Sequence, residues 1–353
     1  MASGLDGIVA AETVLSHTDR KAGMVWVRGH DLPHLVADYG FEGTVALLWE
    51  GFAGEGLTRT GMITMLAEAR RAAFAALPAW LPQTVGRPLF EGMRIAIAAQ
   101  PDSACAASLV GAITVAVPAL VRQASARPAV TPDPTLTTAA DLLHMLHDAA
   151  PDPAKTLALD TYFTVMAESG LSASAFAARV VASTRASLAA SVLAAWCAFT
   201  GGLHGGAPGP TLDMLDAAEA APDLEPWLEQ KLRGGERLMG FGHRVFSGND
   251  PRAEAMRRSM QAMGPYAGRL AFADRLEKAV GTVVQRVKPG RALPPNVEIT
   301  AALLLDAVDI PRDAFTPIFA VGRSAGWLAH AMEQQKTGRM IRPTSTYIGP
   351  PIG

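Results

Sequence analysis

Residues 316–332 have the sequence TPIFAVGRSAGWLAHAM, and this stretch decides the fold class. Its apolar side chains recur at the three- and four-residue spacing of a helix, namely Ile318, Val321, Ala325, Leu328, Ala329 and Met332. Thr316 is placed to cap this helix at its start. Arg323 falls two turns inside the apolar segment, so it lies either on an exposed face or buried against an anion.

The same helical spacing recurs along most of the chain. Leu212, Leu215, Ala218 and Ala221, for example, form one apolar face. Only residues 23–29, GMVWVRG, alternate as a strand does between bounding glycines. The proline-rich segments 127–134 and 149–153 are short enough to be connectors between helices. The pattern predicts an all-α protein.

Composition narrows the class of function. The chain has 353 residues, 49% of them hydrophobic, and a formal charge of −2. Such a length can bury one large core or two smaller ones, and the near-neutral charge argues against a nucleic-acid partner. Only Cys105 and Cys197 are present, so we expect neither a disulfide framework nor a cysteine-built metal site.

Two long uncharged stretches, 103–121 and 187–203, approach the length of a membrane-spanning helix. Both are rich in alanine, glycine, serine and threonine, and Pro118 interrupts the first. We therefore expect buried helices and no membrane partner. The first residues also lack a basic segment followed by an apolar one, so we expect a cytoplasmic protein.

Charged residues stand at the predicted starts of two more helices. Asp250 can cap a helix with Pro251 at its first position, which places Arg252 in a first turn that favours anions. Asn296 can cap another helix, which leaves Glu298 in its first turn, where the helix dipole favours an ionised carboxylate.

Several segments resemble citrate synthase and occur in that family's order. They are GLDGIVAAET (4–13), VRGHD (27–31), FEGTVALLWE (41–50), GLHGGA (202–207), MGFGHRV (239–245), DPR (250–252), PNVE (295–298), GRSAGWLAH (322–330) and IRP (341–343). The resemblance covers most of the chain and is weakest from about residue 52 to residue 137.

The resemblance implies an all-α, citrate-synthase-like homodimer whose active-site cleft lies between a large and a small domain. Residues 1–207 and 313–353 would form the large domain, and residues 208–312 the small one. Closure of the domains over the substrates would exclude water from a reactive enol.

The resemblance also implies the reaction and its catalytic residues. An acyl-CoA, with acetyl-CoA first, condenses with a 2-oxo acid, and hydrolysis of the thioester releases CoA. Glu298 would remove the α-proton while His204 donates a hydrogen bond to the thioester oxygen. His243 would polarise the carbonyl of the 2-oxo acid.

Three arginines match those that bind the carboxylates of the acceptor, namely Arg252, Arg323 and Arg342, the last supplied across the dimer interface. Three arginines suit a 2-oxo dicarboxylate, with oxaloacetate first. The CoA-binding loop would comprise Leu238, Met239, Gly240, Phe241 and Gly242. The resemblance implies no metal and no permanently bound cofactor.

This sequence departs from the family pattern at two places. The usual base is Asp, and Glu298 places its carboxylate about 1.5 Å further out. Ser169 replaces a histidine that contacts the acceptor, and Ser172 replaces an asparagine. These serines leave open a bulkier 2-oxo acid, a longer acyl-CoA as in 2-methylcitrate synthase, weak activity on oxaloacetate, or a paralogue that binds without turnover.

Overall fold

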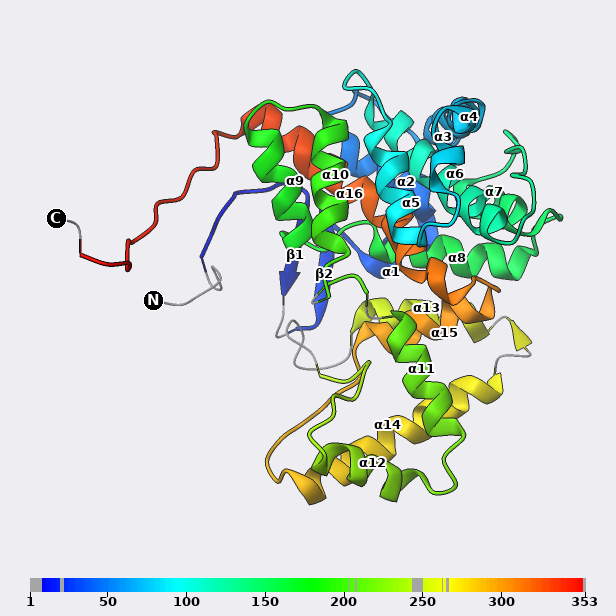
Figure 1. The fold of residues 1–353 in the computed structure, drawn as a ribbon, viewed down its shortest axis with the longest axis vertical. Helices are drawn as coiled ribbons and strands as arrows, with labels where there is room; N and C mark the ends of the chain where they lie inside the picture. The colour runs from blue at the N-terminus through cyan, green and yellow to red at the C-terminus, as the bar shows by residue number, and fades with distance from the viewer. Residues whose placement is uncertain are drawn as a thin grey trace.

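The computed structural model of the chain describes residues 8–19, 22–202, 204–206, 208–242, 250–261, 263–264 and 267–351. Nearly all of its regular structure is helical, which confirms the predicted all-α class (Figure 1). Both described ends of the chain extend from the same side of the molecule. Cys105 and Cys197 are free and exposed.

The described strands form one small antiparallel sheet with the order β1-β2-β3. β2 (Met24–Val27) lies inside the predicted strand, and its Val25 and Val27 are buried. It pairs with β1 (Ser16–Asp19) on one side and with β3 (His30–Asp31) on the other. The sequence did not indicate β1, because its four residues SHTD are all polar, or β3, because two residues are too few to display an alternation.

The first half of the chain builds a layered helical body. Its helices are α1 (Leu32–His34), the π-helical turn η1 (Leu35–Tyr39), α2 (Gly40–Trp49), α3 (Arg59–Ala75), α4 (Leu77–Trp80), the 3-10 turn η2 (Leu81–Thr84), α5 (Leu89–Ala98), α6 (Ala106–Ala124), α7 (Thr138–His147), α8 (Pro153–Met166), α9 (Ala173–Ser183) and α10 (Leu188–Phe199). The proline-rich segments before α7 and α8 are connectors, as predicted.

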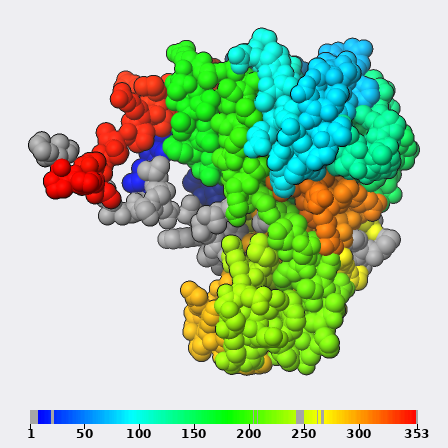
Figure 2. Space-filling model, viewed as in Figure 1, coloured from blue at the N-terminus to red at the C-terminus, as the bar shows by residue number. Residues whose placement is uncertain are grey.

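The second half first builds a smaller group of helices and then returns to the body. These elements are α11 (Pro208–Glu219), α12 (Leu224–Arg233), α13 (Pro251–Gln261), α14 (Ala267–Val287), α15 (Val297–Ala307), the 3-10 turn η4 (Arg312–Ala314) and α16 (Phe315–Thr337). In Figure 2 the residues of α11 and α12 bulge below the larger upper part. The proposed division into two domains remains a prediction.

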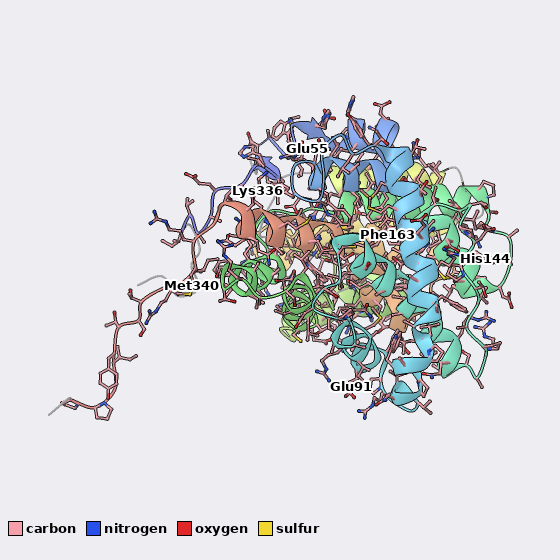
Figure 3. The ribbon with its side chains drawn as sticks, turned by 90° about the horizontal axis from the view of Figure 1, so that it is seen from above. Glu55, Glu91, His144, Phe163, Lys336 and Met340 are labelled. Carbon is pink, nitrogen blue, oxygen red and sulfur yellow. The ribbon has the colours of Figure 1, made fainter. Side chains whose placement is uncertain are left out.

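α16 is the central helix of the body. Every residue from Phe315 to Gln334 is buried, and the helix packs against α2, α6, α8, α9 and α10. Its approach to α8 is close because glycine stands at two contact positions. A Cβ at Gly322 would lie 3.2 Å from the Cα of Phe163, and one at Gly326 would overlap the carbonyl oxygen of Ala167. Phe163 accordingly lies near the middle of the helical layers in Figure 3.

The predicted cap at Thr316 is wrong. α16 begins at Phe315 and Ala314 is its N-cap residue, because η4 runs directly into the helix. The hydroxyl of Thr316 instead donates to the carbonyl oxygen of Gly205, at 3.0 Å. This bond joins the chain that enters α11 to the helix that returns to the body.

α6 is the one helix, within the described ranges, that is long and apolar enough to cross a membrane. Of its apolar window, 89% is buried inside the protein. It packs against α3, α5, α7 and α16, so its apolar surface is covered by other helices.

Candidate active site

A cavity of about 560 Å³ lies where the body meets the helices of the second half. Elements far apart in sequence contribute to its wall, including α13, α15 and α16. Eight residues singled out from the sequence line it, namely Ser169, Ser172, His204, Gly242, Arg252, Asn296, Glu298 and Arg323. The fold therefore brings together a carboxylate, an imidazole and two guanidinium groups.

His204 is half-buried, and the edge of its ring meets the ring of Phe199, with the ring centres 5.1 Å apart. Burial lowers the pKa of His204 to about 4, and the positive charge of Arg323 acts in the same direction. The imidazole is therefore neutral at neutral pH, when one ring nitrogen donates a hydrogen bond and the other accepts one.

Ser174 determines which nitrogen of His204 carries the proton. Its backbone N–H donates to Nε2 of His204 at 3.3 Å, and its hydroxyl lies 2.8 Å from the same nitrogen. A nitrogen that accepts from a backbone N–H carries no proton, so the neutral ring holds its proton on Nδ1. The indole N–H of Trp327 donates to the hydroxyl oxygen of Ser174 at 3.0 Å and so fixes it in turn. Neither residue stood out in the sequence, because a serine or a tryptophan on an apolar helix is ordinarily a packing residue.

Arg252 lies in the first turn of α13 and is buried. Its backbone N–H donates to Asp250, in agreement with the predicted cap, and its Nε and one terminal nitrogen also bind Asp250, at 3.0 and 2.6 Å. Burial alone would lower the pKa of Arg252, but Asp250 raises it above the usual value. The other terminal nitrogen donates to the hydroxyl of Ser169 at 3.4 Å.

Arg323 is buried rather than exposed, with 4% of its surface accessible. Its Nε donates to the carbonyl oxygen of Met166 at 2.6 Å, and its guanidinium lies over the ring of Phe319, 4.9 Å from the centroid. Burial lowers its pKa to about 10 although Glu168 opposes the shift, so the group stays charged at neutral pH. A buried cation beside a cavity favours an anionic ligand.

Glu298 stands in the first turn of α15, as predicted. The side chain of Asn296 caps the helix by accepting from the backbone N–H of Glu298, at 2.9 Å. The half-buried carboxylate of Glu298 thus lies at the positive end of a helix and lines the cavity.

The loop 238–242 is joined to the segment that precedes Glu298. Phe241 and Pro295 form an antiparallel bridge, and Gly242 donates to the carbonyl oxygen of Pro294 at 2.8 Å. Asn296 donates from its backbone N–H to Gly240 and from its side chain to Gly242, at 2.8 and 3.2 Å. At Gly240, φ is +82° and a Cβ would overlap Ile299, so the close approach requires glycine.

Of this loop only Gly242 lines the cavity. Leu238, Gly240 and Phe241 are buried and Met239 is half-buried. Arg342 is exposed in the extended segment after α16 and lies away from the cavity wall. His243 lies outside the described residues.

The two serines that replace family residues differ in their contacts. Ser172 caps α9, because its hydroxyl accepts from the backbone N–H of Ala175 at 3.3 Å. Ser169 has its hydroxyl near Arg252 only, at 3.4 Å, among the described contacts. Both serines line the cavity, but the Ser172 hydroxyl is engaged as a helix cap, so Ser169 is the position that bears on acceptor binding.

Part of the cavity wall was not indicated by the sequence. Residues before and on β1 line it, namely Thr13, Ser16, His17 and Thr18, as does Val25 of β2. β1 is held there because Ser16 donates to the buried Glu168 at 2.8 Å, and Glu168 also accepts from the backbone of Gly170 at 2.6 Å. The hydroxyl pattern of a four-residue strand carries no signal that would place it at this cavity.

The carboxylate of Glu168 also belongs to a buried ionic network. Burial would raise its pKa, but His330 lowers it, and the carboxylate lies 3.1 Å from Nε2 of that histidine. Nδ1 of His330 faces Arg179 at 3.0 Å, and Arg179 also binds Glu333 at 2.5 Å. Glu333 in turn accepts from the backbone N–H of Val14. The network thus holds the N-terminal segment against α9 and α16.

No group of three or more histidine, cysteine, aspartate or glutamate side chains in the described part of the chain could hold a metal ion. The groups that line the cavity include two guanidinium groups, the neutral imidazole of His204 and the carboxylate of Glu298. Such a set can bind an anion, donate a hydrogen bond to a developing negative charge and remove a proton.

Comparisons with known proteins give one consistent result. The family model described as "Citrate synthase, C-terminal domain" matches residues 4–344. The chain is 36% identical over 351 residues to the "Putative citrate synthase 2" of Mycobacterium tuberculosis, which covers 98% of this chain and 92% of that protein. It is 30% identical over 368 residues to the "Citrate/2-methylcitrate synthase" of Bacillus subtilis, covering 98% and 96% of the two chains.

The fold is similar to that of a solved relative. The crystal structure of citrate synthase from Thermotoga maritima superposes with a TM-score of 0.86 at 26% sequence identity. The match covers 99% of this chain and 96% of that one. The resemblance inferred from the sequence motifs is confirmed.

Proposed function

Because the chain belongs to the citrate synthase family, we propose that it condenses acetyl-CoA with oxaloacetate to give citrate and CoA. One observation is the main support for this proposal. Glu298, His204, Arg252 and Arg323 line a single cavity, although they come from four separate segments of the chain. Each supplies a group that this condensation requires.

The first step is removal of a proton from the α-carbon of the thioester. We assign this step to the carboxylate of Glu298, and the hydrogen bond to the thioester oxygen to Nδ1–H of His204. The contacts of Ser174 to Nε2 support this assignment, since they leave Nδ1 as the donor. A neutral imidazole stabilises the developing enolate oxygen by donating a hydrogen bond, without transferring its proton.

The second step forms the carbon–carbon bond. The enol carbon attacks the carbonyl carbon of the 2-oxo acid, whose oxygen takes up a proton, and we assign polarisation of that carbonyl to His243. Water then hydrolyses the thioester and releases the CoA thiol. Hydrolysis makes the overall reaction effectively irreversible.

We assign the binding of acceptor carboxylates to Arg252 and Arg323. Their burial supports this assignment, since a desolvated guanidinium binds a carboxylate more strongly than an exposed one does. We assign the contact with the adenine end of CoA to the loop 238–242. Its attachment to the segment before Glu298 supports this placement.

Arg342 would complete the acceptor site of a partner subunit in a homodimer. Its exposure on an extended segment, away from its own cavity, supports this reading. We propose in addition a cytoplasmic location and the division into a large domain, 1–207 with 313–353, and a small domain, 208–312.

Ser169 favours a second candidate function. Its hydroxyl is shorter than the imidazole usual at this position and lies 3.4 Å from Arg252. Losing one charge-assisted contact would weaken acceptor binding by about ten- to a hundredfold. A bulkier 2-oxo acid or a longer acyl-CoA would then be the better substrate.

The test follows release of the CoA thiol from acetyl-CoA and oxaloacetate by the purified protein. Release should require both substrates and should fall by about two orders of magnitude or more in Glu298→Gln, which keeps the shape of the side chain. A panel of 2-oxo acids and of acetyl- and propionyl-CoA then ranks the two candidates. If no pair releases thiol while CoA still binds, the protein is a non-catalytic paralogue and the proposal is wrong.

A further inference from the structure

Tyr162 carries a buried hydroxyl that the proposed mechanism does not use. The residue lies on α8 and is 0% exposed. Its hydroxyl oxygen has no hydrogen-bond partner among the residues that the structure describes. Leaving a buried hydroxyl without a partner costs about 1–3 kcal/mol, and native proteins retain few such groups. This one therefore calls for an explanation.

The position of Tyr162 provides one. α8 packs against both α15, which begins with the turn that carries Glu298, and α16, which carries Arg323. The edge of the Tyr162 ring meets the ring of Phe319, with the centres 6.2 Å apart, and Arg323 covers that same ring. The phenol thus stands immediately behind the cavity wall.

Electrostatics points to the same neighbours. Burial is the largest cause that raises the pKa of Tyr162 well above its usual value, and the negative charge of Glu298 adds to it, while Arg323 opposes it. The phenol therefore keeps its proton at physiological pH and can donate. Of these two charged neighbours only Glu298 can accept a hydrogen bond, because a guanidinium group has no acceptor.

We propose that Tyr162 is a positioning residue for the catalytic base: in the substrate-bound enzyme its hydroxyl donates to the carboxylate of Glu298. This inference rests on the proposed function of Glu298. It also explains how the longer Glu can serve where the family usually has Asp. A glutamate has one more rotatable bond, and a second anchor restricts the carboxylate to one orientation.

The charged and titratable groups around Glu298 define what a pH profile would report. Arg252 on α13, Arg323 on α16 and Tyr162 on α8 interact electrostatically with it, and the same cavity is lined by His204, His17 and Glu168. A donor to the ionised carboxylate stabilises the charged form. Removing that donor should therefore raise the pKa of the base and move the acidic limb of kcat/KM to higher pH.

The test is Tyr162→Phe, which removes only the hydroxyl. Because the hydroxyl has no described partner in the free protein, we expect Tm to be unchanged or higher. We expect kcat to fall about ten- to a hundredfold, the size of a hydrogen bond to a charged group. KM for both substrates should change less than about threefold. Tyr39→Phe is the matched control, since the Tyr39 ring packs against His30 and His34 instead.

A second measurement distinguishes failure of the role given to Tyr162 from failure of the proposed reaction. An infrared pH titration, taken as the difference between the wild type and Glu298→Gln with oxaloacetate and CoA bound, follows the Glu298 carboxylate without turnover. In Tyr162→Phe that carboxylate should titrate at higher pH. An unshifted band, or unchanged kcat with an unchanged acidic limb, would overturn the role of Tyr162. If the wild type releases no thiol but the Glu298 band still shifts in Tyr162→Phe, the proposed reaction is overturned and the role of Tyr162 stands.

Discussion

Ser174 is a small side chain with several contacts. Its hydroxyl accepts from Trp327, lies 2.8 Å from Nε2 of His204, and lies 3.3 Å from the hydroxyl of Ser172. One hydroxyl thus links the imidazole to the central helix. The backbone N–H of Ser174 supplies the same nitrogen with a second donor.

We therefore expect Ser174→Ala to reduce kcat/KM several-fold without abolishing activity, because the backbone donor to His204 remains. The indole N–H of Trp327 would lose its buried acceptor, at a cost of about 1–3 kcal/mol in the free energy of unfolding. Steady-state kinetics and denaturant unfolding measure the two effects. Ser324→Ala is the control, because that buried hydroxyl bonds only within α16, to Val321. Equal behaviour of the two variants would contradict the role given to Ser174.

Single residues were predictable where local chemistry identifies them. The capping role of Asn296 and the first-turn position of Glu298 follow from the sequence of a helix start. Ser174, Trp327 and Tyr162 were not predictable as parts of the site. Ser174 contacts His204 across 30 positions and Trp327 across 153, and Tyr162 lies behind the cavity wall, so no local pattern encodes these roles.

At the scale of elements, the approach of α8 to α16 depends on small residues. Gly326 meets the backbone of Ala167, and Gly322 meets that of Phe163. This approach also allows Nε of Arg323 to reach the carbonyl oxygen of Met166. The position of one guanidinium in the site is therefore set by how closely two helices pack.

A methyl group at position 326 should push these helices apart. We expect Gly326→Ala to lower the free energy of unfolding by about 1–3 kcal/mol, the usual cost of overpacking, and to raise KM for the acceptor. Gly281→Ala is the matched control, since Gly281 is exposed on α14 with nothing near its Cβ position. That variant should be about 0.5–1 kcal/mol more stable, because alanine favours the helix. Thermal and urea unfolding distinguish the pair, and a stabilised Gly326→Ala would contradict the packing argument.

The elements themselves were largely predictable. The apolar spacing of residues 318–332 correctly predicted a helix, and α16 is buried from Phe315 to Gln334. The start of α16 was predicted wrongly, because a tertiary bond to Gly205 uses the hydroxyl that the local pattern assigned to a cap. β1 was missed because its residues, Ser16–Asp19, are all polar, and its place at the cavity depends on a tertiary bond from Ser16 to Glu168.

At the scale of the whole molecule, the segment after α16 leaves the body. Met340, Tyr347 and Ile348 are exposed along it, and Met340 lies outside the packed helices in Figure 3. Exposed apolar side chains on an extended segment are suited to a protein–protein contact. This supports the proposed homodimer, in which Arg342 would reach the partner's cavity.

Mixing two inactive variants tests that arrangement. If Arg342 acts across the interface, a heterodimer of Arg342→Ala with Glu298→Gln contains one intact site and one doubly defective site. Random reassociation of equal amounts should then restore about a quarter of wild-type thiol release. Each variant alone is the control. No recovery, in a mixture shown to exchange subunits, would mean that Arg342 acts within its own chain or not at all.

The bridge between Phe241 and Pro295 has a practical consequence for protein engineering. Residues 238–242 and 294–298 are separated by some fifty positions, yet hydrogen bonds at Gly240 and Gly242 make them one structural unit. If residues 238–242 alone were replaced by those of a relative, to alter the preferred thioester, the new loop would not match residues 294–296. The carboxylate of Glu298, which follows them, would then be displaced. Chimeras should therefore take residues 238–242 and 294–298 from the same relative.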